Sequence, residues 1–129
     1  MKQVWIGIGM ILLFSMNCPG QEIQWASEVV FQFNQFSENE YDATQALGIP
    51  DAVPFGEMSA SAFRLNSESG YGTITLGYQT PQPVSQVFIV ENFLSGRVSK
   101  VILHDTDQKA HTIDERSVTN IDHPLIIIE

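Results

Sequence analysis

Hydrophobic and polar residues alternate through the middle of the chain in a pattern typical of β-strands. Residues 72–78 (GTITLGY) place Ile74, Leu76 and Tyr78 on one face and threonine or glycine on the other. Residues 84–90 (VSQVFIV) become apolar on both faces, as expected of a strand buried within a sandwich. Together these segments predict an antiparallel all-β domain rather than a nucleotide-binding α/β fold or a helical bundle.

A β-hairpin is predicted after these strands. The strand-like segments 98–104 and 110–113 are separated by the polar segment 105–109. With a tight turn at the centre of that segment, His104 faces His111 across the hairpin. Two imidazoles could share a metal ion, but a structural zinc site needs four ligands, so an ordinary cross-strand pair is the preferred interpretation.

Two further strands and one helical turn are predicted nearer the N-terminus. Residues 29–33 and 59–65 have the composition of strands, the second with small residues on one side. Between them, Asp42 is a good helix N-cap, Gln45 follows three residues later as in a capping box, and Gly48 suits the left-handed C-terminal position. The helix is expected to be a single turn because a proline follows at once.

The first twenty residues have the layout of a secretory signal peptide. Lys2 gives a positive start, residues 4–16 are uncharged and mostly apolar, and cleavage is expected after Gly20. The apolar stretch is shorter than the roughly 20 residues that a membrane-spanning helix needs. The sequence therefore predicts a signal peptide (1–20) and one exported domain (21–129), located in the periplasm, at the outer membrane or outside the cell, with no transmembrane span in the mature chain.

Cys18 is the single cysteine of the chain. It could instead be the lipidated cysteine of a bacterial lipoprotein signal, although Asn17 is bulkier and more polar than the small residue usual before such a cysteine. The mature domain has no pair of cysteines for a disulfide, so its stability is expected to come from the β core.

The chain is strongly acidic. It has six Lys and Arg against fifteen Asp and Glu, a formal net charge of −9, and removal of the signal peptide takes away one of the lysines. Such a surface disfavours nucleic acid and anionic lipid as partners. It is compatible with cations, neutral sugars or basic proteins.

The chain ends in an apolar run after a polar segment. Residues 124–128 (PLIII) could pair as a strand, but nothing after them covers a remaining sheet edge. An open edge is a place where a strand from a neighbouring chain can pair, so an edge-strand partner is one expectation.

Several segments together resemble the galactose-binding-like, or discoidin-like, jelly-roll domains of exported bacterial proteins. The matching segments are Trp25–Ser27, 41–51 (YDATQALGIPD), 72–78 (GTITLGY), 84–100 (VSQVFIVENFLSGRVSK) and the hairpin at His104–Asp107. In particular, they are similar to the module found ahead of OmpA-type peptidoglycan-binding domains in cell-envelope proteins of Bacteroidetes-like bacteria.

The resemblance covers most of the chain between Trp25 and Ile113. It implies an antiparallel jelly-roll β-sandwich of about eight strands that binds carbohydrate or other surface ligands. The sequence ends before the strands that usually complete the jelly roll. The resemblance therefore implies either a shortened copy or a partner chain that supplies the missing edge.

Three carboxylates lie near the predicted helical turn, in the region where several galactose-binding-like domains hold a structural calcium. Calcium binds carboxylate and carbonyl oxygens, so the candidate metal ligands are Asp42, Asp51 and Glu57. Asp42 is already explained as an N-cap and Asp51 by the Pro–Asp turn. Structural roles are therefore preferred, and no cofactor is required.

Sugar binding uses flat aromatic faces beside planar hydrogen-bonding side chains, here expected on loops at one end of the sandwich. Most aromatic residues of a small β-sandwich instead pack in the core or under loops. Glu91 and Asn92 follow a buried strand directly, so they are expected to satisfy backbone groups at the strand end. The candidate ligand-binding residues are Tyr41, Phe55, Arg64, Tyr71, Asn92 and Arg97.

Catalysis has little support in the sequence. No nucleophile elbow, no Gly-rich phosphate loop and no motif that marks a histidine as a base is present. The sequence thus predicts a non-enzyme, a binding module at the bacterial cell envelope that recognises glycan or a cell-surface protein. A structural module that pairs an open sheet edge with a partner chain is the alternative, and an acidic hydrolase is a third hypothesis.

Overall fold

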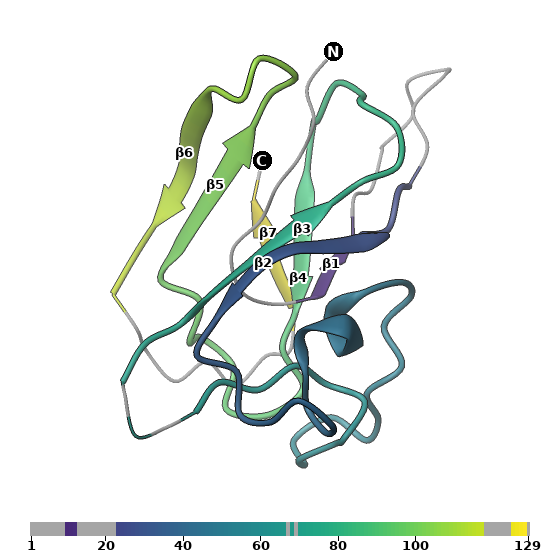
Figure 1. Cartoon of the computed structure of the whole chain (residues 1–129), viewed down its shortest axis with the longest axis vertical. Coiled ribbons are helices and arrows are strands. Elements are labelled where there is room, and N and C mark those ends of the chain that lie inside the picture. Colours follow the sequence, from purple (N-terminus) through teal and green to yellow (C-terminus); the bar gives the residue numbers. More distant parts are fainter. Residues whose placement is uncertain (1–9, 13–22, 67, 69, 118–124, 129) are drawn as a thin grey trace.

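The structure is a computed structural model and describes residues 10–12, 23–66, 68, 70–117 and 125–128 (Figure 1). Strands dominate its regular structure, with one short 3₁₀ turn, so the predicted all-β class is confirmed. The elements are β1 (Met10–Leu12), β2 (Glu28–Phe33), η1 (Ala43–Ala46), β3 (Thr73–Gly77), β4 (Val87–Val90), β5 (Lys100–His104), β6 (Ala110–Glu115) and β7 (Leu125–Ile128).

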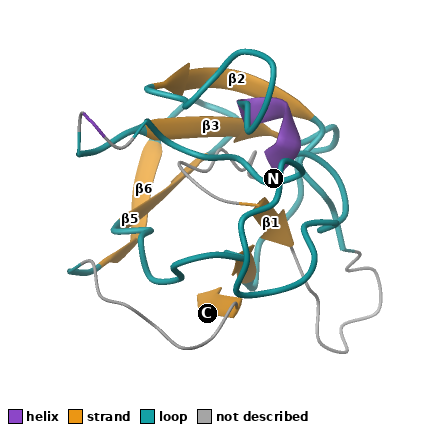
Figure 2. Ribbon diagram, turned by 90° about the horizontal axis from the view of Figure 1, so that it is seen from below, coloured by secondary structure: helices purple, strands orange, loops and turns teal. Residues whose placement is uncertain are grey.

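The strands form three small antiparallel sheets. β4 lies between β1 and β7, β2 pairs with β3, and β5 pairs with β6. Figure 2 shows the β2–β3 pair on one side of the molecule, β1 and the C-terminal end on the opposite side, and the β5–β6 hairpin along the flank between them. The loops of residues 34–66 gather at one end of the strands (Figure 1).

One buried cluster joins the three sheets. Ile74 and Leu76 of β3 and Ile89 of β4 are fully buried, and Tyr78 shares the buried face as the alternation predicts. Burying an aliphatic side chain of this size contributes roughly 1.5–3 kcal/mol to folding, so this cluster is the main source of stability. The remaining members are Ala26, Ala43, Ala46, Val87, Val98, Val101, Leu103 and Ile128.

β1 comes from the predicted signal peptide. Its three residues pair antiparallel with Val90, Ile89 and Phe88 of β4. On the other side of β4, β7 pairs along its whole length, which confirms that the C-terminal apolar run forms a strand. The expected cleavage point after Gly20 and the lipidation candidate Cys18 lie outside the described residues.

The predicted helical turn is present as η1. The Asp42 side chain caps it, but its Oδ1 accepts from the backbone N–H of Thr44 at 2.9 Å rather than from that of Gln45. The Thr44 hydroxyl donates to the same oxygen at 2.6 Å. Gly48 has a φ of +76° and its N–H donates to the Ala26 carbonyl at 2.9 Å, which ties the end of the turn to the core.

The strand predicted over residues 59–65 is wrong. This segment forms a turn in which the Ala62 N–H donates to the Ser59 carbonyl at 3.1 Å, and Leu65 makes a single isolated bridge to Gln35. The Ser59 hydroxyl accepts from the Ser61 N–H at 3.3 Å. Serine side chains compete for backbone groups in this way, and alanines offer little surface to bury, so the segment does not form a strand.

The predicted register of the β5–β6 hairpin is also wrong. Asp105 and Lys109 close a three-residue loop, in which the Gln108 N–H donates to the Asp105 carbonyl at 2.9 Å and Gln108 has a φ of +62°. The loop is one residue longer than the tight turn that the prediction assumed. His111 consequently lies opposite Leu103 instead of His104, so the two imidazoles are not cross-strand partners.

Candidate functional site

A cleft of about 570 Å³ opens beyond the C-terminal end of β4. Its volume is within the range of small-molecule sites. Three parts of the chain form its lining: the loops before residue 67, the approach to β3, and the connection from β4 to β5. The lining residues are Tyr41, Gln45, Ala52, Met58, Ser59, Ala62, Phe63, Arg64, Leu65, Asn66, Gly70, Tyr71, Gly72, Val90, Glu91, Asn92, Phe93, Leu94, Arg97 and Ser99.

Five of the six residues predicted to bind a ligand line this single cleft. They are Tyr41, Arg64, Tyr71, Asn92 and Arg97. The sixth, Phe55, is exposed on the loop that follows η1 and is not part of the lining. The structure therefore gathers side chains that are up to 56 positions apart in sequence, from Tyr41 to Arg97.

Arg64 is held by both its backbone and its side chain. Its N–H donates to the Tyr41 carbonyl at 3.0 Å, and its own carbonyl accepts from the Phe36 N–H at 2.8 Å. The guanidinium carbon lies 4.3 Å from the centre of the Phe36 ring and 5.7 Å from that of Tyr41, and the two rings meet edge to face. Cation–π contacts of this kind attract the guanidinium group to the rings and so restrict where it lies.

Tyr71 reaches the cleft because the chain turns tightly into β3. The Asn34 amide donates to the Tyr71 carbonyl at 2.6 Å, and the ring of Phe33 lies 5.8 Å from the Tyr71 ring. Gly72 is buried, and a side-chain carbon there would lie 2.7 Å from the Phe33 carbonyl oxygen and would overlap the Leu65 side chain. Glycine is thus required at position 72, where the backbone lies close to Phe33 and Leu65. The neighbouring Tyr71 remains 69% exposed.

The connection from β4 to β5 is fixed by the Glu91 carboxylate. Its Oε2 accepts from the Gly96 N–H at 2.7 Å and its Oε1 from the Arg97 N–H at 3.1 Å. The Ser95 hydroxyl donates to the Glu91 carbonyl at 3.0 Å. The prediction that Glu91 satisfies backbone groups at the strand end is confirmed. This loop carries Phe93, which is 42% exposed, on the rim of the cleft.

Asn92 joins the same loop to the segment after η1. Its amide donates to the Glu57 carbonyl at 2.7 Å, and its own carbonyl accepts from the Gly56 N–H at 2.6 Å. Met58, on that segment, and Leu94 complete the rim with exposed apolar side chains. Neither residue was predicted from the sequence, although exposed large apolar residues in glycine-containing loops are a signal for such a rim.

The three calcium candidates have different surroundings. Asp42 caps η1, whereas Asp51 and Glu57 are exposed. Within the described ranges, no group of three or more His, Cys, Asp or Glu side chains could hold a metal ion. Calcium binding therefore remains a prediction from the sequence.

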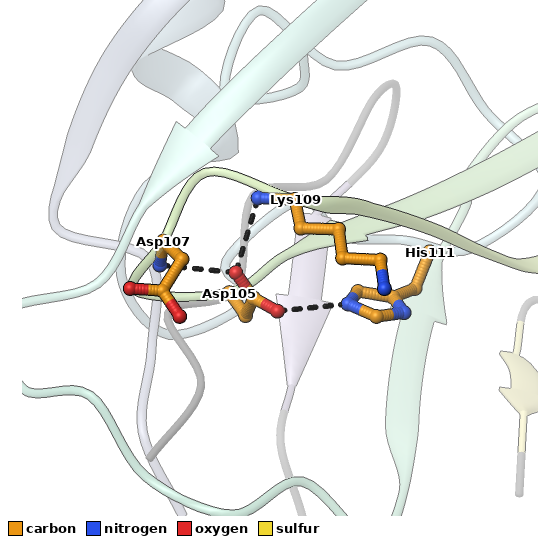
Figure 3. A network of polar contacts seen from close by, with 4 residues as sticks. All are labelled: Asp105, Asp107, Lys109 and His111. Carbon is orange, nitrogen blue, oxygen red and sulfur yellow. Dashed lines mark hydrogen bonds and ion pairs between the residues drawn. The ribbon is translucent and has the colours of Figure 1, made fainter.

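A second polar cluster lies at the turn between β5 and β6 (Figure 3). Oδ1 of Asp105 accepts from the N–H groups of Asp107 and Lys109, both at 3.0 Å, and Oδ2 lies 2.9 Å from Nε2 of His111. These contacts, with the His111 hydrogen bond the largest cause, hold the pKa of Asp105 below its ordinary value of 3.8. Both carboxylate oxygens are used within the turn, which makes the cluster a structural one.

Comparisons of the chain with protein-family models, with curated proteins and with solved structures each found no match. In the described part of the chain, no helix is long and apolar enough to cross a membrane.

Proposed function

We propose that this protein is an exported, non-catalytic binding module of the bacterial cell envelope that recognises glycan through the cleft beyond β4. The observation that carries the proposal is that five residues chosen for their suitability as sugar contacts line one cleft of about 570 Å³. In this proposal strands β2 to β7 are parts of a galactose-binding-like jelly roll, and residues 1–20, which include β1, are its signal peptide.

The chemistry of the lining supports a sugar ligand. Sugar rings stack their C–H faces on aromatic side chains, and Tyr71 and Phe93 expose such faces at the rim. Sugar hydroxyls accept hydrogen bonds from planar donor groups, which Arg64 and Arg97 supply from the lining. An apolar rim with a few polar groups is the usual composition of a ligand site.

A glycan array followed by titration calorimetry tests this function. We expect binding to a restricted set of oligosaccharides. Replacing Tyr71 by alanine should weaken it at least ten-fold, a loss of about 1.4 kcal/mol. The matched control is Phe31→Ala, which removes a similarly exposed aromatic ring from β2 outside the lining. An array with no bound glycan, or equal affinities for Tyr71→Ala and the unaltered protein, would refute the proposal.

Assembly through a sheet edge is a second candidate function, favoured by the pairing of β1 with β4. If residues 1–20 are removed as predicted, β4 loses the partner that pairs with Phe88–Val90. An exposed strand edge next to a buried strand can accept a strand from a neighbouring chain.

The secreted product distinguishes this second candidate from the first. Analytical ultracentrifugation over a range of concentrations should show a dimer whose formation does not respond to sugar. A synthetic peptide that contains residues 10–12 should compete with the dimer for β4. A mature protein that stays monomeric up to millimolar concentration would exclude assembly through this edge.

A further inference from the structure

Positive charge is scarce in this protein, and a large share of it lies at the cleft. Two of the cations outside the predicted signal peptide are ion-paired on the hairpin, Lys100 with Glu115 at 3.2 Å and Arg116 with Asp114 at 2.6 Å. The five cations outside the predicted signal peptide are Arg64, Arg97, Lys100, Lys109 and Arg116.

Arg64 and Arg97 line the cleft, and neither forms an ion pair with a carboxylate of the described residues. Glu91 is the one acidic residue in that lining as far as the structure describes it. Both of its oxygens accept backbone N–H groups, from Gly96 and Arg97. In a chain of net charge −9, the cleft thus offers two guanidinium groups whose charge has no carboxylate partner.

The geometry of Arg64 suits an oxyanion. The contact with the Phe36 ring engages the charge of the guanidinium and not its N–H hydrogen bonds, so the donors remain available to a ligand. Among the described residues, its one side-chain hydrogen-bond acceptor is the sulfur of Met58 at 3.7 Å, which is a weak acceptor. A planar fork of donors held in this way matches the two oxygens of a carboxylate.

We infer that the cleft selects sugars that carry a carboxylate, that is, uronic acid residues. The carboxylate binds to Arg64, Arg97 adds a second positive charge, and the sugar ring packs on the aromatic rim formed by Tyr71 and Phe93. This inference rests on the proposed glycan binding and narrows its ligand class. The exposed aromatic rim favours a sugar over an acidic peptide, because it provides flat apolar faces beside the cations.

A pair of probes that differ at the carboxylate, one free and one esterified, tests the inference. The full chain is titrated by calorimetry with an oligogalacturonide and with the same oligosaccharide as its methyl ester. We expect the acid to bind at least ten-fold more tightly than the ester. Arg64→Lys keeps the charge but removes the planar fork, so this variant should lose most of the preference for the acid.

Two further variants separate charge from packing. Arg97→Gln removes an exposed cation without touching the Phe36 stack, and it should lower the affinity for the acid while leaving that for the ester unchanged. Lys109→Gln makes the same change of charge at the hairpin turn, where the backbone N–H of residue 109 still donates to Asp105. This control should bind both probes as the unaltered protein does.

Each of the following results would overturn one step of the inference. Equal binding of acid and ester, or full preference for the acid in both arginine variants, overturns selection of the carboxylate while the glycan proposal stands. Tighter binding of a glutamate oligomer than of the oligogalacturonide overturns the choice of a sugar. If neutral glycans bind and the oligogalacturonide does not, the inference is wrong. If no sugar binds, the proposed function fails with it.

Discussion

The turn between β5 and β6 and the cleft beyond β4 both gather charged side chains, but they differ in whether those charges have partners. At the turn, each oxygen of Asp105 accepts hydrogen bonds from residues at most six positions away. At the cleft, neither Arg64 nor Arg97 forms an ion pair with a carboxylate of the described residues. The backbone of Arg64 is held by the distant Phe36 and Tyr41, whereas the backbone N–H of Arg97 donates to Glu91 in the same loop.

This difference distinguishes polar groups with a structural role from polar groups that are available to a ligand. A carboxylate whose acceptors are filled by its own turn gains little from a ligand, because it would have to exchange existing hydrogen bonds. A guanidinium fixed by stacking retains donors that water occupies until a ligand replaces it. Pre-organisation with open donors is the condition for tight and selective binding.

The largest effect is expected from changing the shape of the cleft. Gly72→Ala places a carbon against the Phe33 carbonyl and the Leu65 side chain, so we expect a loss of about 1–3 kcal/mol in the free energy of unfolding. Urea denaturation measures it. In the control Gly77→Ala, the new carbon meets the flexible Glu28 side chain instead, so the loss should be smaller. Equal losses at both glycines would contradict the role assigned to Gly72.

Removing the Glu91 carboxylate should have the next largest effect. Glu91→Ala leaves the N–H groups of Gly96 and Arg97 without their acceptor, which costs about 1–2 kcal/mol in stability. The loop that carries Phe93 also loses its position, so glycan affinity should fall more than stability alone explains. Glu91→Gln keeps one acceptor oxygen and should recover part of both losses. A variant with unchanged affinity would show that this loop does not position the site.

Where the sequence predicted the fold correctly, the signal was local and chemically strong. The alternation around Ile74 and Leu76 uses branched side chains that fill a pleated surface, and the cap at Asp42 depends on the next two residues alone. The failures had equally local causes. Small serines and alanines over residues 59–65 favour a turn, and the left-handed φ of Gln108 lengthens the hairpin loop by one residue.

The candidate site was partly accessible from the sequence. Choosing residues by side-chain type brought Arg64 and Tyr71 into view, because aromatic rings can stack on sugar rings and planar polar groups can bond to sugar hydroxyls. Their convergence on one cleft could not be predicted, since it depends on the backbone bonds that join Arg64 to Phe36 and Tyr41. Phe55 shows the limit of the approach, because side-chain type does not tell which way a loop faces.

Tyr78 carries its polar group in the core, whereas the arginines of the cleft carry theirs at the surface. Its hydroxyl is buried and has no hydrogen-bond partner among the described residues, and burial raises its pKa strongly. An unpartnered polar group is available to a ligand at a surface, but in the core it is a cost. We therefore expect Tyr78→Phe to leave stability unchanged or to raise it by up to about 1 kcal/mol in urea denaturation. A loss above that size would mean that the hydroxyl has a partner.

The smallest effect is expected at the hairpin turn, where it depends on pH. The pKa of Asp105 is lower in the folded protein, so its ionised form stabilises the fold above its ordinary value of 3.8 and this contribution is lost as the pH falls below it. Thermal unfolding from pH 7 to pH 3 should show Asp105→Asn less stable at neutral pH and the difference shrinking below about pH 4. Asp107→Asn is the control, because residue 107 contributes its backbone N–H and not its carboxylate. A stability difference that stays constant over this pH range would mean that the Asp105 carboxylate does not stabilise the turn. Asp105 would then not be a structural charge that can be contrasted with the arginines of the cleft.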